Sequence, residues 1–367
     1  MANFMDGIKE LQNGKINAAV EIFQQVSKSG DYHASYQLAQ MFNQGVIVKK
    51  DIQAASEYFD LAFKQLNDSQ DSNEKTYLLA TFYLYGLGTV GKDEFKAVEL
   101  LERGTKNKDA NCAILLANCY RNGIGCDKND EQAFSLISNF KDINHPIAAK
   151  VYADCLFYGN GTEVNYSQAA KYYQKAAEMG EVSSMFMLGT MYHEGKGVEI
   201  DEKKSFDYFL QAGNYNHPDA LKNIAYFYSK GIAVEKDSMK EVQYLKKYAD
   251  TGSADGMFIY GSTCLDSSRR LYKYVEGIEY LKNAVQLKDA RATMLVGQIY
   301  EKGLYGTFKN ERLAFNHYMV AYNLGLKSAA IEVLRCLKQH IGVEGNTQAK
   351  VEEFEKIVEE LKSQNQA

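Results

Sequence analysis

The chain has 367 residues, with 42 basic and 47 acidic side chains and a net charge of −5. No basic stripe is visible, which argues against nucleic acid as a partner because clustered Lys and Arg are needed to neutralise phosphates. No apolar run approaches the roughly 18 residues of a membrane span, and the N-terminus lacks the apolar core of a signal peptide, so we expect a cytoplasmic protein without direct membrane insertion.

Six cysteines are spread along the chain without a Cys-x-x-Cys motif. Without an export signal, such thiols are expected to stay reduced and to be buried as small apolar side chains. Cys112, Cys119 and Cys126 are seven residues apart, and the sequence leaves open whether they would pair in an exported protein.

The first thirty residues predict a helix hairpin of distinct character. The segment from Phe4 to Leu11 is short and polar, whereas the segment from Ala18 to Gly30 resembles the second helix of the repeat that follows. We interpret residues 1–30 as an N-terminal cap or a degenerate repeat.

A pattern of about 36 residues then recurs along the chain, as in stacked repeat proteins. In one copy, Leu188 and Tyr192 fall on one face of a predicted helix, with an apolar second helix around Phe206. Gly195 and Gly197 end the first helix, because glycine readily adopts the positive φ of a helix C-terminus. Neither helix is long enough to be stable alone, so neighbouring copies must cover their apolar faces.

Successive copies of this pattern vary in their turns. They cover residues 33–66, 74–106, 109–140, 145–180, 181–214, 217–252, 253–288 and 289–325. The copy at 253–288 keeps both helical segments but loses the Gly-x-Gly turn, so we expect it to stack less rigidly or to bend the array. Residues 31–326 are predicted to form one solenoid of about eight repeats.

Residues 327–367 are predicted to form C-terminal capping helices and a tail. Residues 327–340 resemble one more first helix, and residues 348–361 form a charged helix with one apolar side. A polar outer face suits a cap, because it shields the last apolar surface of a solenoid from water.

The units resemble Sel1-like repeats, a subfamily of the TPR-type α/α solenoids. The matching residues in two adjacent copies are Ala169, Tyr172, Tyr173, Lys175, Ala176, Ala177, Gly180, Leu188, Gly189, Tyr192, Gly195, Gly197, Val198 and Asp201. The resemblance implies an all-α fold, a right-handed α/α superhelical solenoid of helix-turn-helix repeats with capping helices at both ends.

The resemblance also implies a class of function. Proteins with such repeats are similar in acting as adaptors and scaffolds in quality control, signalling or enzyme activation. We therefore expect a non-catalytic adaptor that binds a protein or peptide in the concave face of the solenoid. The alternative is a hydrolase of the β-lactamase-like or wall-directed kind, as proposed for some secreted relatives.

The sequence favours the adaptor over the hydrolase. It shows no nucleophile–base pair, no metal-ligand set and no cofactor loop, so we expect no catalytic residue, metal or cofactor. The stretch from Gly86 to Gly91 matches a glycine-rich phosphate loop, but a predicted helix precedes it where a strand is required. Asp93 also stands where such a loop has Ser or Thr, so we expect an ordinary turn. The oligomeric state stays open.

The candidate binding site lies on the first helix of each copy, because first helices line the concave wall of two-helix solenoids. Two outward positions on each of these helices form two rows. The first row comprises Tyr36, Tyr77, Ile114, Lys150, Phe186, Lys222, Phe258 and Met294, and the second comprises Gln40, Thr81, Asn118, Asp154, Thr190, Tyr226, Ser262 and Gln298. Aromatic anchors beside hydroxyls and amides suit an extended peptide, whose backbone needs hydrogen-bond partners.

Eleven residues of these rows form the predicted protein- or peptide-binding groove. They are Tyr36, Tyr77, Asn118, Lys150, Asp154, Phe186, Thr190, Lys222, Tyr226, Phe258 and Gln298. Lys150 and Lys222, with Tyr226, suggest an acidic segment as the occupant. The alternative is that these polar residues simply face water, and whether the concave or the convex face binds stays open.

Overall fold

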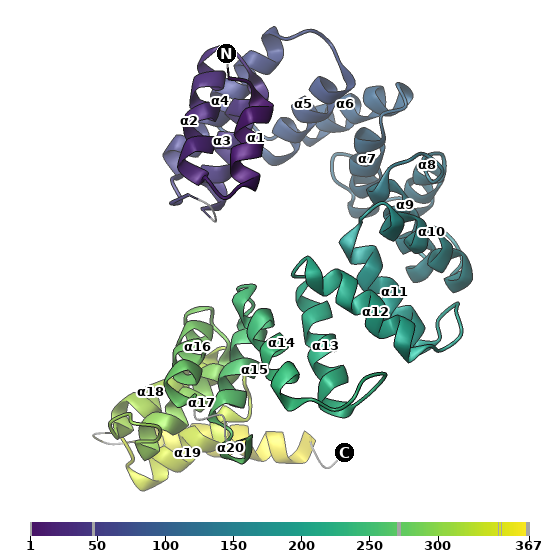
Figure 1. The fold of residues 1–367 in the computed structure, drawn as a ribbon. Helices are drawn as coiled ribbons and strands as arrows, with labels where there is room; N and C mark the ends of the chain where they lie inside the picture. Colours follow the sequence, from purple (N-terminus) through teal and green to yellow (C-terminus); the bar gives the residue numbers. More distant parts are fainter. Residues whose placement is uncertain (1, 46–47, 270–272, 344, 346, 365–367) are drawn as a thin grey trace. The chain divides into compact units, whose positions relative to one another are not determined.

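The computed structural model describes residues 2–45, 48–269, 273–343, 345 and 347–364. The chain divides into two compact units, residues 1–181 (unit 1) and residues 182–367 (unit 2). In both units the described residues form α-helices joined by short turns, together with one short 3₁₀ helix and no strand (Figure 1).

The described residues of unit 1 form ten α-helices in chain order. They are α1 (Phe4–Gln12), α2 (Ile16–Lys28), α3 (Tyr32–Gln44), α4 (Ile52–Asp68), α5 (Asn73–Tyr85), α6 (Glu94–Lys106), α7 (Ala110–Asn122), α8 (Asp130–Ser138), α9 (Pro146–Tyr158) and α10 (Tyr166–Glu178).

Unit 2 continues the same alternation of helices. They are α11 (Val182–Glu194), α12 (Glu202–Asn214), α13 (Pro218–Lys230), α14 (Ser238–Asp250), α15 (Ala254–Leu265), α16 (Tyr274–Gln286), α17 (Ala290–Lys302), α18 (Glu311–Asn323), α19 (Ala329–Gln339) and α20 (Gln348–Gln364), with the 3₁₀ helix η1 (Ser267–Arg269) after α15.

Helices that are consecutive in the chain pack against each other throughout each unit. The odd-numbered helices from α3 to α19 are the first helices of their repeats and are called A helices; the even-numbered helices from α4 to α20 are the B helices. Within a unit, each A helix contacts its own B helix, and each B helix contacts the next A helix. The helix α7 also touches the A helices α5 and α9 directly. The all-α repeat solenoid predicted from the sequence is confirmed.

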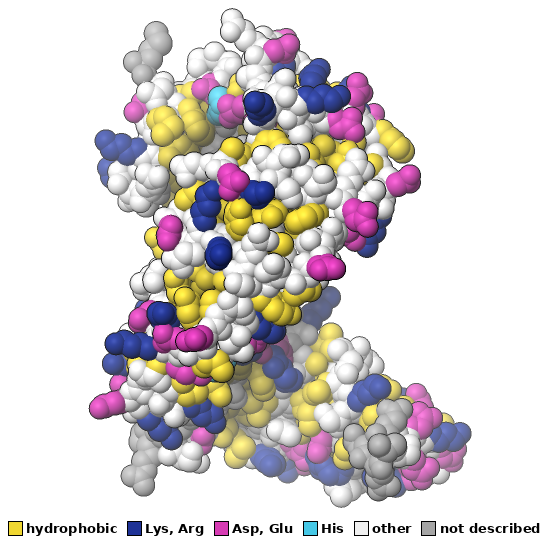
Figure 2. Space-filling model, turned by 90° about the vertical axis from the view of Figure 1, so that its right-hand side faces the viewer, with side chains coloured by type: hydrophobic (Ala, Val, Ile, Leu, Met, Phe, Trp, Pro, Cys, Tyr) yellow, Lys and Arg dark blue, Asp and Glu magenta, His cyan; other side chains and the backbone are white. Residues whose placement is uncertain are grey.

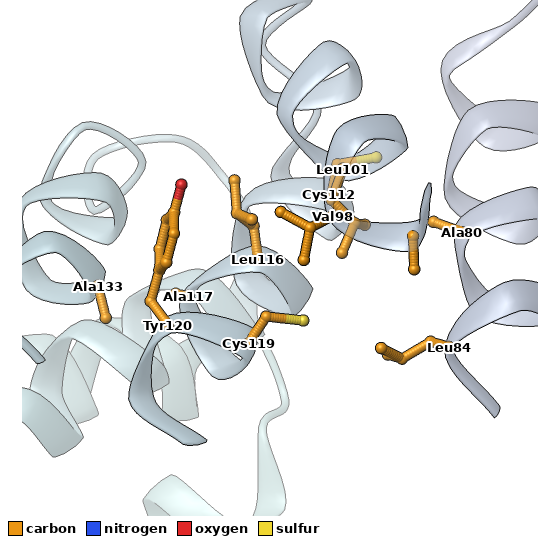
Figure 3. Packing of buried hydrophobic residues seen from close by; sticks show 11 residues of the cluster. Ala80, Leu84, Val98, Leu101, Cys112, Leu116, Ala117, Cys119, Tyr120 and Ala133 are labelled. Carbon is orange, nitrogen blue, oxygen red and sulfur yellow. The ribbon is translucent and has the colours of Figure 1, made fainter. Parts of the chain in front are cut away.

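The apolar core is divided into clusters that neighbouring repeats share. In one cluster Leu84 from α5, Leu101 from α6 and Leu116 from α7 are buried together, and Ala133 from α8 closes it (Figure 3). Because these side chains come from more than one repeat, each repeat relies on the next one to bury its apolar faces.

Polar caps fix where the B helices begin. The side-chain oxygen of Asn165 accepts a hydrogen bond from the Gln168 N–H at 3.0 Å, and Asp201 accepts one from the Lys204 N–H at 3.0 Å. These residues occupy equivalent positions in successive repeats, so the cap is part of the repeat pattern and satisfies amides that the helix itself leaves unpaired.

The Gly-x-Gly turn of one repeat also packs directly against the preceding repeat. Gly159 ends α9 in the left-handed conformation, with φ of 73°. A Cβ on Gly161 would lie 2.0 Å from the backbone oxygen of Asp130, and one on Gly125 would lie 2.3 Å from that of Glu94. Asp130 and Glu94 are the first residues of the preceding B helices. The second glycine is therefore required because the two backbones touch.

The repeat at 253–288 keeps both of its helices, as predicted, although it lacks this turn. Residues 270–272, between its two helices, lie outside the described residues. A Cβ on Gly261 would lie 2.8 Å from the Gly277 carbonyl oxygen, so α15 and α16 approach each other backbone to backbone. Losing the turn does not separate these two helices.

The two ends of the chain pack as caps would. The helix α20 buries Phe354 and Val358 while Glu353 and Glu359 are exposed. At the other end, the ring of Phe4 in α1 packs on a buried ring of α2. The division into residues 1–30, 31–326 and 327–367 stays a prediction. No helix among the described residues combines the length and the apolar character needed to cross a bilayer.

The backbone contact at Gly161 can be tested by substitution. We expect Gly161→Ala to lower the free energy of unfolding by more than about 2 kcal/mol, because a positive φ costs alanine about 1–2 kcal/mol and the clash adds to that. Gly306→Ala is the matched control: its φ of 81° is also positive, but a Cβ there meets no atom within 4 Å. Urea unfolding followed by circular dichroism measures both losses, and equal losses would contradict the packing role of this turn.

Candidate functional site

The A helices carry all eleven candidate residues, and none of the eleven is fully buried. Unit 1 holds Tyr36, Tyr77, Asn118, Lys150 and Asp154, and unit 2 holds the other six. In each unit, the accessible side of the A helices that these residues mark is called the A-helix face.

In unit 1, first-row tyrosines contribute to packing between repeats. The ring of Tyr36 on α3 lies 5.8 Å, centroid to centroid, from Phe82 on α5 and meets it edge-on. It also lies 5.7 Å from Phe59 on α4. Burial raises the pKa of the phenols of Tyr36 and Tyr77. These side chains therefore offer only part of their surface to a ligand.

In unit 2, first-row residues contact the start of the next A helix. Phe186 stacks on His217, the N-cap of α13, with ring centroids 4.7 Å apart. The guanidinium of Arg291, at the start of α17, lies 4.4 Å from the ring centroid of Phe258. The first row thus joins successive repeats.

Asp255, in the first turn of α15, is the centre of a polar cluster. Its carboxylate accepts hydrogen bonds from Lys222 Nζ at 2.8 Å, Arg291 Nη2 at 2.8 Å and the Tyr248 hydroxyl at 2.9 Å. Burial acts to raise the pKa of Asp255, but these hydrogen bonds outweigh it and hold the pKa at about 2. One ionised carboxylate therefore links α13, α14, α15 and α17.

The two lysines of the predicted groove already have carboxylate partners. Lys150 Nζ lies 2.7 Å from Asp154, which also accepts a hydrogen bond of 2.7 Å from the Tyr173 hydroxyl. Lys222 is held by Asp255 in the same way. An acidic segment would have to displace these carboxylates, so the paired lysines give the acidic-occupant hypothesis no support.

Accessibility varies along the second row: two of its side chains are exposed, whereas Thr81 is buried. Asn118 is exposed, and Tyr226 is 45% exposed on α13. Thr190 directs its hydroxyl to the Phe186 carbonyl at 3.2 Å, so its hydrogen bond closes within its own helix. Gln298 is half-buried. Hydrogen-bonding capacity is therefore unevenly spread along the row.

A third row on the A-helix face was missed by the sequence reasoning. It consists of the last residue of seven of the nine A helices that the described residues form, one turn beyond the second row: Gln44, Tyr85, Asn122 and Tyr158 in unit 1, and Glu194, Lys230 and Lys302 in unit 2. All are exposed, Tyr85 by 58% and Tyr158 by 60%. Extending the four-residue spacing of the two rows by one more step locates this row in the sequence.

The glycine-rich stretch at 86–91 forms the expected turn. Gly86 ends α5 in the left-handed conformation, and Asp93 caps α6 by accepting a hydrogen bond from the Lys96 N–H at 3.0 Å. A helix precedes the stretch, whereas a phosphate loop follows a strand.

All six cysteines are free thiols, and five of them are buried. Burial raises the pKa of Cys119, Cys155 and Cys336 to about 11, so these thiols stay protonated and unreactive near neutral pH. Within the described ranges, no three His, Cys, Asp or Glu side chains gather as a metal site requires.

Basic and acidic side chains are interspersed on the side of the molecule drawn in Figure 2. Among the side chains that this view colours, Lys and Arg form no continuous patch, and hydrophobic side chains lie between the charges. This side therefore lacks the clustered basic charge that binds a phosphate backbone.

A family model described as the Sel1 repeat matches most of the chain. The matched segments are residues 33–65, 76–109, 110–138, 146–181, 182–214, 218–252 and 290–326. The repeat that lacks the Gly-x-Gly turn is not among them.

Two solved structures are similar in fold. A protective antigen of uropathogenic Escherichia coli strains, displaying an SLR fold, is 22% identical with a TM-score of 0.62, and the match covers 92% of this chain and 71% of that one. A Sel1 repeat protein from Oxalobacter formigenes is 19% identical with a TM-score of 0.61, covering 87% and 89%. At these identities the likeness shows the fold alone. A comparison with curated proteins finds no match.

The cluster around Asp255 makes a prediction about acid stability. Because folding lowers the pKa of Asp255 to about 2, its ionised form stabilises the fold above the unfolded pKa of about 3.9, and this contribution is lost as the pH falls from about 4 towards 2. We expect Asp255→Asn to unfold at lower urea concentration than the wild type at pH 7, with the difference shrinking below pH 4.

The matched control is Asp219→Asn, which changes the exposed carboxylate at the equivalent position of α13. This variant should follow the wild-type profile. Urea midpoints measured between pH 2 and pH 7 decide the matter, and a constant difference between Asp255→Asn and the wild type would contradict the assigned role.

Proposed function

The chain belongs to the Sel1 repeat family, and we propose that it is a non-catalytic adaptor that binds a protein or peptide along its A-helix face. Sel1 repeats typically form protein-interaction scaffolds. In this role the chain helps to assemble or regulate a complex in quality control, signalling or enzyme activation, and the partner supplies any catalysis.

The exposed aromatic side chains of the A-helix face carry this proposal. Tyr85, Tyr158 and Tyr226 are each about half exposed or more, in a chain whose other tyrosines often pack in the core. Tyrosine supplies a large contact area with a hydrogen-bonding end, which is why it is enriched among the residues that dominate binding energy.

The polar surroundings of these tyrosines support a peptide or protein as the ligand. Second- and third-row neighbours such as Asn118 and Asn122 offer both donors and acceptors, which a polypeptide backbone can use. The cytoplasmic location is part of the same proposal, and the six free thiols support it, because disulfides persist mainly in oxidising compartments.

Tyrosine substitutions test the proposal. We expect the double variant Tyr85→Ala with Tyr226→Ala to recover at least about tenfold less of its partner than the wild type, because aromatic anchors contribute a large share of binding energy. The measurement is quantitative mass spectrometry after affinity capture from cells that express the full chain.

The matched control is Tyr215→Ala. Tyr215 is 64% exposed but is the C-cap of the B helix α12 and belongs to no A helix. The Tyr215→Ala variant should recover as much partner as the wild type. A partner lost with Tyr215→Ala and retained by the double variant would place binding elsewhere and overturn the proposal.

A further inference from the structure

Three of the four A helices that the structure describes in unit 1, α3, α5 and α7, carry few charges, whereas the fourth, α9, carries the ion pair of Lys150 and Asp154. In α3, α5 and α7 the charged or titratable basic and acidic side chains are His33, Glu74, Lys75 and Arg121, and none of them belongs to the second or third row. Those two rows consist here of amides, hydroxyls and a phenol: Gln40, Gln44, Thr81, Tyr85, Asn118 and Asn122, which together are called the uncharged strip. Thr81 is buried and donates its hydroxyl hydrogen to the Tyr77 carbonyl at 2.9 Å, so the other five residues form the accessible part of the strip.

In unit 2, by contrast, the third row carries charged side chains. Glu194, Lys230 and Lys302 occupy the third row there. Beside them, Lys222 and Arg291 are already paired with Asp255. The uncharged strip therefore differs from the third row of unit 2, and also from α9 of unit 1, whose second-row residue Asp154 is paired with Lys150.

The helices that carry the uncharged strip lie side by side. The helix α7 touches α5 directly, and the ring of Tyr36 packs α3 against Phe82 of α5. The strip therefore spans three neighbouring A helices.

The amides of the strip are ordered but not saturated. Gln44 Nε2 donates to Gln40 Oε1 at 3.2 Å, and Asn122 Nδ2 donates to Asn118 Oδ1 at 2.8 Å. Within the described part of the chain, the side-chain oxygens of Gln44 and Asn122 accept no hydrogen bond and are available as acceptors, whereas Asn122 Nδ2 already donates to both the carbonyl and the side-chain oxygen of Asn118. A peptide backbone presents N–H donors and C=O acceptors in alternation, and its N–H groups complement these side-chain oxygens.

The size and polarity of the strip indicate its occupant. Helices in contact lie about 8–10 Å apart and an extended peptide advances about 3.3 Å per residue, so crossing three helices takes roughly six residues. A charged side chain docked there would lose water without gaining an opposite charge, which is costly, whereas an uncharged segment loses little.

We propose that the uncharged strip is the peptide-docking part of the A-helix face and that it takes an extended, uncharged segment of about six residues. This inference rests on the proposed function, because it names which part of the face binds and what it accepts. Tyr85, the one exposed aromatic side chain in the strip, is the anchor against which the segment packs.

The test uses the full chain and a phage-displayed library of random twelve-residue peptides. We expect enriched peptides to share an uncharged stretch of about six residues. For the synthetic peptides, the Kd measured by fluorescence anisotropy should change less than about twofold between 50 and 500 mM NaCl, because salt screens charge pairs and not neutral contacts. Tyr85→Ala and Asn122→Asp should each raise the Kd at least about tenfold.

Two variants serve as controls, with circular dichroism confirming that every variant folds. Tyr215→Ala, outside the A-helix face, and Lys230→Ala, in the charged third row of unit 2, should leave the Kd unchanged. Enriched peptides that are charged, a Kd that rises more than tenfold with salt, or failure to enrich any peptide would overturn the inference about the strip.

The outcomes also separate this inference from the proposed function. If Lys230→Ala abolishes binding while Tyr85→Ala and Asn122→Asp do not, the A-helix face binds peptide but the strip is the wrong part of it. If the selected peptides bind all of these variants equally well, both the strip and the A-helix face are excluded as their binding site.

Discussion

Burial of each helix hairpin by its neighbours is the constraint on which the rest of the structure depends. Hairpins of 13-residue helices such as α11 and α12 are too short to be stable in water, so their apolar faces must be shared along the array. At Gly161 the backbone of one repeat lies so close to the first turn of the preceding B helix that a Cβ on this residue would clash with it.

The same constraint decides which side chains remain for binding. Residues early in the A helices, such as Tyr36, Phe186 and Lys222, are drawn into contacts with the next repeat. The side chains that stay accessible, such as Asn118 and Tyr85, lie on the later turns, where we propose that the ligand binds. A solenoid can change its ligand by altering those turns without disturbing the contacts that hold the repeats together.

Much of the fold could be predicted from the sequence, because repeat length, capping residues and turn glycines are local signals. Helical spacing around Leu188 and the paired glycines at 195 and 197 locate the helices and turns to within a few residues. The site could be predicted only in part. That Lys222 meets Asp255, 33 residues away, depends on how two repeats stack, which no local pattern encodes. The third row was not predicted, although Tyr85 lies four residues beyond Thr81 of the second row.

Oxidative footprinting of the tyrosines tests most directly the claim that partners bind the A-helix face. Hydroxyl-radical labelling with mass spectrometry would compare the free chain with the chain saturated by its captured partner. The account predicts that Tyr85 loses reactivity on binding while Tyr215, of similar exposure, keeps it. Protection of Tyr215 with Tyr85 unchanged would show that the ligand binds away from the A helices and would contradict the account.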